Sequence, residues 1–413
     1  MYQLIVNLIQ KCKFEQIVTW LFFITIFAAL SYLTYEQTIA NGFTNSDIRI
    51  HITYAINLLE KPSNLFIFLE PGFALLTIIL VKICSLSFNI AATIVVAMFY
   101  TAFVFVLFKI IKKELKLDNF LTLGICLIAI LVVPIFIPFV SKTFYLLFGS
   151  PNVWHNNTVL LIKVFSLYIT YITMSKIVKA KYDGWFYFLA ASLFVSSLFK
   201  PSYAEVFIPA LFIYSFFSSY KSGNFKQLRY AVLLAIPTIV LLGWQFWAWK
   251  FSAYSFYNIV CPEFPKSFII FTFFDVIQYY THSPFNGSGP LVGFLRANAF
   301  PLVVLMFVNK RVSRELCFSW IMLVIAYLQF AFLAEATDKG MLVSGNFTWG
   351  YIISLQLVFI FSIIDFIKWL ILSRNINIRY LTLKVSTISV LLFWHFVSGV
   401  VYFYRVSSGG SFW

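Results

Sequence analysis

The chain has 413 residues, of which 61% are hydrophobic and only 11% are charged, and its formal net charge is +15. A soluble globular protein carries about 25% charged residues, so this composition excludes a soluble domain. The Lys and Arg residues stand at the ends of apolar segments, which is typical of a membrane protein and excludes a nucleic-acid-binding protein. The five Cys residues show no paired spacing, so neither a disulfide framework nor a zinc site is predicted.

Long apolar runs predict an all-α polytopic membrane protein, because a helix needs about 20 apolar residues to cross a bilayer. Lys11 and Lys13 precede the first run without a small-residue cleavage site after it, so we interpret it as a retained helix. About eleven transmembrane helices are predicted, near residues 17–35, 89–110, 119–139, 157–177, 184–200, 202–219, 229–249, 290–308, 316–334, 349–370 and 381–401.

The distribution of basic residues predicts a cytoplasmic N-terminus, since most Lys and Arg residues then fall in short inner segments. The apolar stretch 71–84 is too short for an ordinary span, and a span there would place the basic run 109–116 outside. We therefore predict one outer loop over 36–88 with a re-entrant or interfacial helix at 71–84. It also holds an amphipathic surface helix with Ile48, Ile52, Ala55, Ile56 and Leu59 on its apolar face.

Three further outer loops are predicted at 140–156, 250–289 and 335–348, whereas the inner loops are short and basic. No repeat or low-complexity linker divides the chain, so 1–413 is interpreted as a single integral membrane domain. Elaborated structure on one face predicts that the functional site lies there.

Ionisable residues near the outer ends of helices are the candidate site residues, because such groups are costly at membrane depth. Asp47 is a candidate general base, although with Ser46 it is equally suited to cap the surface helix. Glu70 is a second candidate catalytic carboxylate, with the start of the 71–84 helix as the alternative. Arg49 and His51 are candidate substrate contacts or groups facing solvent and lipid headgroups.

The segment GSPNVWHNNT is the densest polar cluster in the chain. Amides and an aromatic ring are suited to hold sugar hydroxyls, while an interfacial aromatic belt is the alternative. The candidate sugar contacts are Asn152, Trp154, His155 and Asn156.

Lys200 and Glu205 flank a helix hairpin and either pair with each other or bind substrate, with Lys200 taking a phosphate. Arg296 lies inside a predicted helix, and an Arg fork there is suited to a phosphate or pyrophosphate. Glu335 completes the candidate substrate-binding residues, and no metal ligand set is predicted.

The layout of residues 17–116 resembles the GT-C class of membrane glycosyltransferases: a first helix, a long outer loop with an early acid, a surface helix and a short Pro-containing helix. The stretch EPGFALL at 70–76 is similar to one in bacterial exopolysaccharide polymerases. The resemblance implies a catalytic base at Asp47. Ser46 and Ile48 flank it instead of a second acid, so the use of a divalent cation stays open; no other cofactor is expected.

The resemblance further implies sugar or glycan transfer from a polyprenyl-phosphate or polyprenyl-pyrophosphate donor to a glycan acceptor, on the outer face of a bacterial inner membrane. A single-sugar transferase and an O-antigen or capsule polymerase both fit. The alternative from another class is a flippase for lipid-linked oligosaccharide. Convergence of Asp47, Arg296 and 149–157 around one outer cavity would favour the enzyme.

Overall fold

The computed structural model describes residues 2–39, 46–66, 68–137, 149–251, 267–276, 289–308, 312–337, 342–344, 346–373 and 378–410. Its α-helices are α1 (Tyr2–Ile39), α2 (Ile48–Glu60), α3 (Pro71–Cys84), α4 (Phe88–Leu115), α5 (Asn119–Leu131), α6 (Asn157–Lys176), α7 (Gly184–Phe199), α8 (Ser202–Ser222), α9 (Lys226–Phe251), α12 (Gly289–Val308), α13 (Arg314–Phe332), α14 (Phe347–Leu372) and α15 (Ile378–Ser407). A 3₁₀ helix (Pro62–Phe66) and three strands, β1 (Ser267–Phe271), β2 (Leu333–Thr337) and β3 (Leu342–Ser344), complete the described elements.

The protein is a largely helical, membrane-embedded chain. Seven helices of the described part are long and apolar enough to cross a membrane: α1, α4, α6, α9, α13, α14 and α15. Every range predicted to be a transmembrane helix overlaps an observed helix, but α8 is not among these seven, and α5, α7 and the apolar part of α12 are shorter apolar helices. The number of eleven spans and the orientation remain predictions.

Helices α6 and α14 form the centre of the bundle. In each, 72% of the most apolar window is buried inside the protein, against 22% for α1 and 28% for α15. A peripheral apolar helix in a membrane protein buries its remaining surface in lipid rather than in a protein core. The two central helices are therefore the scaffold from which the outer helices are positioned.

The helix predicted over 119–139 ends early, at Leu131, because Pro134 cannot continue a helix and disfavours helical backbone in the residue before it. The backbone groups that this break frees are bonded by neighbouring helices. Asn152 Nδ2 donates to the carbonyl of Val132 at 2.8 Å, and His395 Nδ1 lies 2.6 Å from the carbonyl of Val133. Broken helices at membrane depth are stable only with such partners.

The loops predicted over 250–289 and 335–348 contain a small antiparallel sheet in their described parts. Strand β1 pairs with β2 in the register Ser267↔Thr337 to Phe271↔Leu333, and β2 pairs with β3. Strand β2 follows α13 without a connecting turn, and β1 is rich in aromatic and β-branched residues that favour strands. Residues 140–148, 252–266, 277–288, 338–341 and 345 of the predicted outer loops lie outside the described residues.

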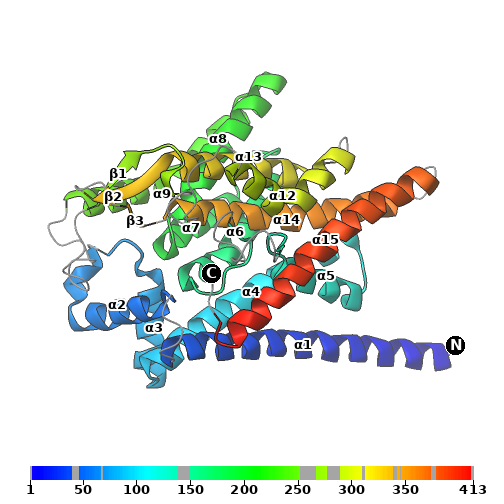
Figure 1. The fold of residues 1–413 in the computed structure, drawn as a ribbon, viewed down its shortest axis with the longest axis horizontal. Helices are drawn as coiled ribbons and strands as arrows, with labels where there is room; N and C mark the ends of the chain where they lie inside the picture. Colours follow the sequence, from blue (N-terminus) through cyan, green and yellow to red (C-terminus); the bar gives the residue numbers. More distant parts are fainter. Residues whose placement is uncertain are drawn as a thin grey trace.

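The region predicted as the first outer loop contains the two predicted helices, α2 and α3, and begins later than expected because α1 continues to Ile39. Helix α2 buries Ile48, Ile52 and Ala55 of its predicted apolar face. Figure 1 shows α2, α3 and the three strands at the same end of the molecule, opposite the N-terminus. How these two helices sit relative to a bilayer remains a prediction.

Candidate active site

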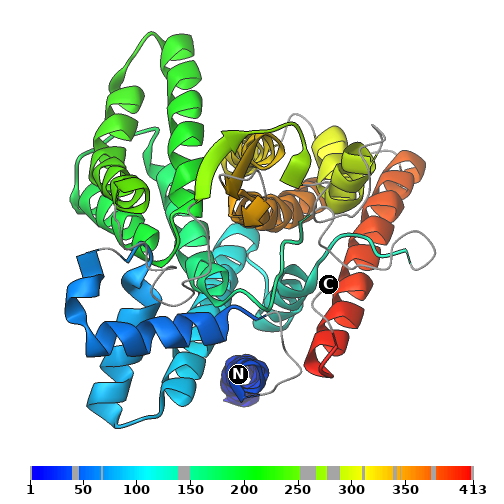
Figure 2. The ribbon, with the colours of Figure 1, turned by 60° about the vertical axis from the view of Figure 1, so that its left-hand side comes forward.

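Several helix ends meet at the end of the molecule that carries α2, α3 and the sheet, the end that comes forward in Figure 2. They gather polar side chains that are far apart in the sequence. We call this group the polar cluster; it comprises Asp47, His51, Glu70, Asn156, Lys200, Glu205 and Glu335. All seven are among the predicted site residues.

Asp47 immediately precedes α2, but its side chain makes no capping hydrogen bond to that helix. Its backbone N–H donates instead to the carbonyl of His155 at 3.2 Å, and its carboxylate accepts a hydrogen bond from the Asn156 amide. Asn156 in turn caps α6, since its Oδ1 accepts from the Val159 N–H at 3.0 Å. The carboxylate is thus oriented by a rigid helix terminus, and capping is not its role.

Burial raises the pKa of Asp47 from 3.8 to about 6, against the opposing effects of Lys200 and the Asn156 hydrogen bond. The side chain keeps some exposure to solvent. A carboxylate with a pKa near neutrality is ionised at pH 7 yet accepts a proton readily, which is the property a general base needs.

Lys200 is the cation of the polar cluster. It is only 5% exposed and its Nζ lies 3.6 Å from Glu70 Oε1, so the ion pair forms with Glu70 and not with the neighbouring Glu205. Burial raises the pKa of Glu70, while Lys200 acts in the opposite direction. Gly72 allows this approach of α3 to α7, because a Cβ there would lie 2.8 Å from the Phe199 ring.

Trp349, in the first turn of α14, lies beside Lys200. The Lys200 Nζ is 5.5 Å from the centroid of its ring, within the range of a cation–π interaction. The close packing of α14 on α8 depends on Gly350, where a Cβ would lie 2.6 Å from a methyl group of Val206. Trp349 therefore supplies an aromatic face inside the polar cluster.

His51 lies one turn into α2, with its ring edge-on to Tyr54 and Phe73. Burial, together with the charge of Lys200, lowers the pKa of His51 from 6.5 to about 3. The imidazole is therefore neutral at pH 7 and is suited to hydrogen bonding rather than to binding an anion. Arg49 lies on the same helix and is half-buried.

Two further acids complete the cluster. Glu205 is held by its backbone carbonyl, which accepts from Gln329 Nε2 at 3.2 Å. Glu335, on β2, accepts from the Asn346 amide at 3.0 and 3.1 Å. The charges of Glu70 and Glu335 both act on Glu205, so the four acids of the cluster form one electrostatic group with Lys200.

The other predicted sugar contacts in the segment before α6 face the protein interior. Trp154 is 3% exposed and packs on Tyr100 and Phe403, while Asn152 is fully buried. His155 is also buried and places its ring 5.9 Å from that of Trp349. These three side chains pack in the interior, whereas the Asn156 side chain is hydrogen-bonded to the Asp47 carboxylate.

Arg296, predicted to hold a donor phosphate, is not brought into the polar cluster. Its Nη2 donates to the carbonyl of Ile135 at 2.9 Å, in the extended segment after the broken helix α5. The charges that act on Asp47, His51 and Glu70 include Lys200 but not Arg296. The Arg296 guanidinium thus bonds a backbone carbonyl in the segment that follows the break in α5.

Three side chains of the site were not singled out from the sequence: Gln37, Asn346 and Trp349. Gln37 Nε2 donates to the carbonyl of Trp154 at 3.0 Å, and its Oε1 accepts from Ser46 at 2.7 Å. Gln37 stands between Glu36 and Thr38 in the last turn of α1, so no sequence signal distinguished it.

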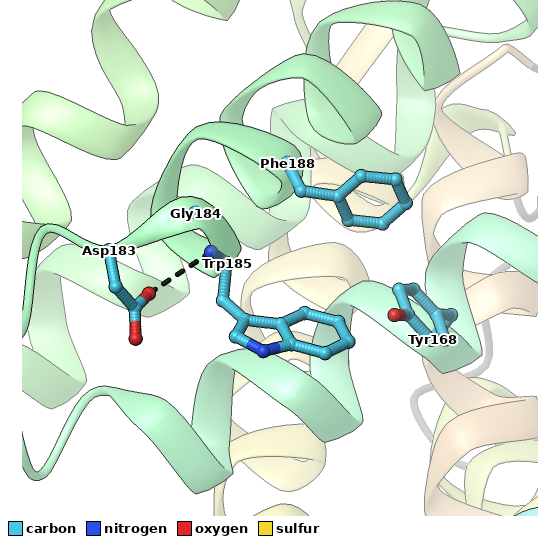
Figure 3. Close-up of a pocket in the computed structure, with 5 residues that line it drawn as sticks. All are labelled: Tyr168, Asp183, Gly184, Trp185 and Phe188. Carbon is cyan, nitrogen blue, oxygen red and sulfur yellow. Dashed lines mark hydrogen bonds between the residues drawn. The ribbon is translucent and has the colours of Figure 1, made fainter.

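Within the described residues, no group of three or more His, Cys, Asp or Glu side chains is arranged to hold a metal ion. A separate cavity of about 510 Å³ lies between α6 and α7, lined by Tyr168, Asp183, Gly184, Trp185 and Phe188 (Figure 3). It adjoins the start of α7, whereas Lys200 follows the end of that helix, about 24 Å away. Its only ionisable side chains are Asp183, which caps α7, and Tyr168, so the polar cluster is the better candidate for chemistry.

No family model matches the sequence, and no curated protein or solved structure matches it. The case for a function therefore depends on the chemistry of the polar cluster.

Proposed function

We propose that the protein is an integral membrane glycosyltransferase of bacterial surface-polysaccharide assembly, acting at the polar cluster on the outer face of the inner membrane. The observation that carries the proposal is the Asp47 carboxylate. It is held by the Asn156 amide, has a pKa near 6, and lies within electrostatic reach of the buried Lys200, whose ammonium faces the Trp349 ring. A base, a cation and an aromatic ring are the groups that a transfer between sugars requires.

In the proposed reaction, Asp47 accepts the proton of an acceptor hydroxyl, and the oxygen of that hydroxyl bonds to the anomeric carbon of the donor. The bond from that carbon to the phosphate oxygen breaks, and polyprenyl phosphate or pyrophosphate leaves. Lys200 is the cation available to the leaving group, with Glu70 holding its ammonium in place. Trp349 offers a face for a sugar ring, and His51, Glu205 and Glu335 are available for hydroxyl groups.

The proposal keeps the two enzyme variants, addition of a single sugar and polymerisation of lipid-linked repeats. Of the groups whose convergence would favour an enzyme over a flippase, Asp47 and Asn156 meet, whereas Arg296 lies apart, so the enzyme is proposed on the chemistry of the polar cluster and not on that convergence. The use of a divalent cation stays open.

The test is an assay in proteoliposomes with a radiolabelled pool of lipid-linked oligosaccharides, comparing wild type with Asp47→Asn. The expected loss is about 10²–10⁴-fold in rate, the usual contribution of a general base. Asp183→Asn is the matched control, because Asp183 only caps α7 and Asn caps equally well. A ladder of products indicates a polymerase and one added sugar a transferase. If the labelled lipid-linked oligosaccharide only moves to the other leaflet, unaltered and equally well in Asp47→Asn, the protein is a flippase and the enzyme proposal fails.

A further inference from the structure

A second buried lysine, Lys163, lies deep in the bundle on the membrane-spanning helix α6. It is completely buried, and its Nζ donates to the carbonyl of Pro151 at 3.2 Å and to Asn152 Oδ1 at 3.0 Å. The ion pairs formed within the described residues, Lys200–Glu70 and Lys368–Glu114, do not include it. Lys163 is therefore a fully buried amino group held by neutral oxygens.

Three aromatic rings surround this ammonium. The centroids of Tyr100, Phe103 and Trp154 lie 5.4, 5.9 and 6.0 Å from Lys163 Nζ. We call these rings the aromatic box. A cation at membrane depth is costly even with such partners, and an apolar side chain would fill the same space at a lower cost. Packing alone does not account for a lysine at this position. Its hydrogen bonds to the segment before α6 offer another reason.

The segment held by Lys163 is 150–156, the stretch that enters α6. Asn152 is its anchor, because its Oδ1 accepts from Lys163 while its Nδ2 donates to the carbonyl of Val132 at 2.8 Å. Gln356, on the central helix α14, also approaches Asn152 Oδ1, at 3.5 Å. Helices α5, α6 and α14 thus converge on one amide.

The far end of the same segment holds Asp47. The His155 carbonyl accepts from the Asp47 N–H and from the Ser46 hydroxyl, both at 3.2 Å, and Asn156 donates to the Asp47 carboxylate. A continuous series of hydrogen bonds and five residues of backbone therefore connects the ammonium of Lys163 to both the backbone and the side chain of Asp47.

We propose that Lys163 is a positioning residue for Asp47, holding segment 150–156 so that Asn156 and the His155 carbonyl meet the Asp47 carboxylate and N–H. This inference rests on the proposed function for its catalytic consequence, but its structural half is independent of activity. Lys163 contacts no substrate in this role; it acts through Asn152 and Pro151.

The experiment uses Lys163→Met in the full-length protein, since Met fits an aromatic surrounding without a charge. Hydrogen exchange measured by mass spectrometry should show faster exchange in peptides that contain the amides of Asp47 and 153–156, with exchange in α6 unchanged. Lys176→Met is the matched control, because Lys176 lies at the other end of the same helix beside Trp185. Unchanged exchange of the Asp47 amide in Lys163→Met would overturn the inference whether or not the protein is a transferase.

The kinetic half is tested through the pH–rate profile. The Asn156 hydrogen bond lowers the pKa of Asp47, so its loss should move the acidic limb of kcat/KM to higher pH. Lys163→Met and Asn156→Ala should produce the same shift, and the double variant no more than either alone. An active Lys163→Met enzyme with the wild-type profile would overturn the positioning role. An inactive wild type would overturn the proposed function and leave the exchange result to decide the inference.

Lys163→Gln is the second variant, for the case that Lys163→Met does not fold. Gln keeps a donor for the Pro151 carbonyl but lacks the reach of Lys, so intermediate exchange at Asp47 is expected. Exchange equal to wild type in a folded Lys163→Gln protein would also overturn the inference.

Discussion

The two buried lysines of this protein lie in opposite surroundings. Lys200, at the end of α7, has Glu70 at 3.6 Å and the charges of Asp47 and Glu205 within electrostatic reach. Lys163, within α6, has two neutral oxygens and three aromatic rings. The charge of Lys200 acts on the pKa values of its neighbours, whereas Lys163 acts through the hydrogen bonds that it donates. The same side chain thus serves electrostatics in one place and positioning in the other.

The comparison predicts its largest effect at Lys200. Replacing Lys200 with Met leaves the carboxylate of Glu70 without its counter-ion, and breaking a buried pair costs about 3–5 kcal/mol. Because Glu70 is 22% exposed, we expect the lower end of this range, about 3 kcal/mol, measured by thermal unfolding in detergent. The second variant Lys200→Met with Glu70→Gln should recover part of the loss. Equal stability of Lys200→Met and wild type would show that the ion pair contributes no net stability.

Removing Lys200 should also move the acidic limb of the pH–rate profile. Lys200 lowers the pKa values of both Asp47 and Glu70, so both values rise when the cation is removed. The limb is expected to shift to higher pH in Lys200→Met and to stay in place in the Lys176→Met control. A shift to lower pH would mean that neither carboxylate controls the rate.

The next largest effect is expected at Asn152, which anchors the segment held by Lys163. Asn152→Leu removes an acceptor of the Lys163 ammonium and a donor to the Val132 carbonyl, leaving a buried charge and a buried carbonyl less well bonded. We expect a loss of about 2 kcal/mol in the free energy of unfolding. Asn152→Leu combined with Lys163→Met should cost less than the sum of the two, because the orphaned ammonium is then absent. Strict additivity would mean that the two side chains do not interact.

Much of this arrangement follows from the sequence, and what does not has a physical reason. Long apolar runs predicted the helices, and a cytoplasmic N-terminus predicted that Asp47, Glu70, Asn156, Lys200 and Glu335 lie toward one end of the molecule. The pairing within that end was not predictable, because it depends on tertiary packing: Gly72 brings Glu70 to Lys200, whereas the sequence offered Glu205 as the nearer partner. Arg296 was expected to bind phosphate because the break in α5 could not be placed from the sequence. That break frees the carbonyl of Ile135, to which Arg296 donates. The strands are too short, and too continuous with α13, to be recognised beforehand.

Replacing Asp47 should change stability less than replacing Lys200 or Asn152, and the change should be stabilising rather than destabilising. Its folded pKa of about 6 exceeds the ordinary 3.8, so the folded state binds the proton more tightly than the unfolded state. The resulting stabilisation is fully present below pH 3.8 and is lost as the pH rises through about 6. Asp47→Asn should therefore be more stable than wild type by about 1–2 kcal/mol at pH 7.5, seen as a higher unfolding temperature, and nearly equal to wild type at about pH 3. A variant less stable than wild type at both values would show that the carboxylate has a structural role.

The smallest effect concerns the aromatic box and separates its rings from their substituents. The Tyr100 hydroxyl is buried and has no hydrogen-bond partner within the described part of the chain, while the ring lies 5.4 Å from the Lys163 Nζ. If the ring face alone holds the ammonium, Tyr100→Phe retains the interaction and removes an unsatisfied polar group, a change of about 0–1 kcal/mol toward greater stability. Tyr100→Leu removes the ring and should be destabilising, with faster exchange of the Asp47 amide as in Lys163→Met. Should Tyr100→Phe prove destabilising by more than about 1 kcal/mol, the hydroxyl must have a partner such as a buried water, and the box would hold Lys163 through hydrogen bonds as much as through its rings.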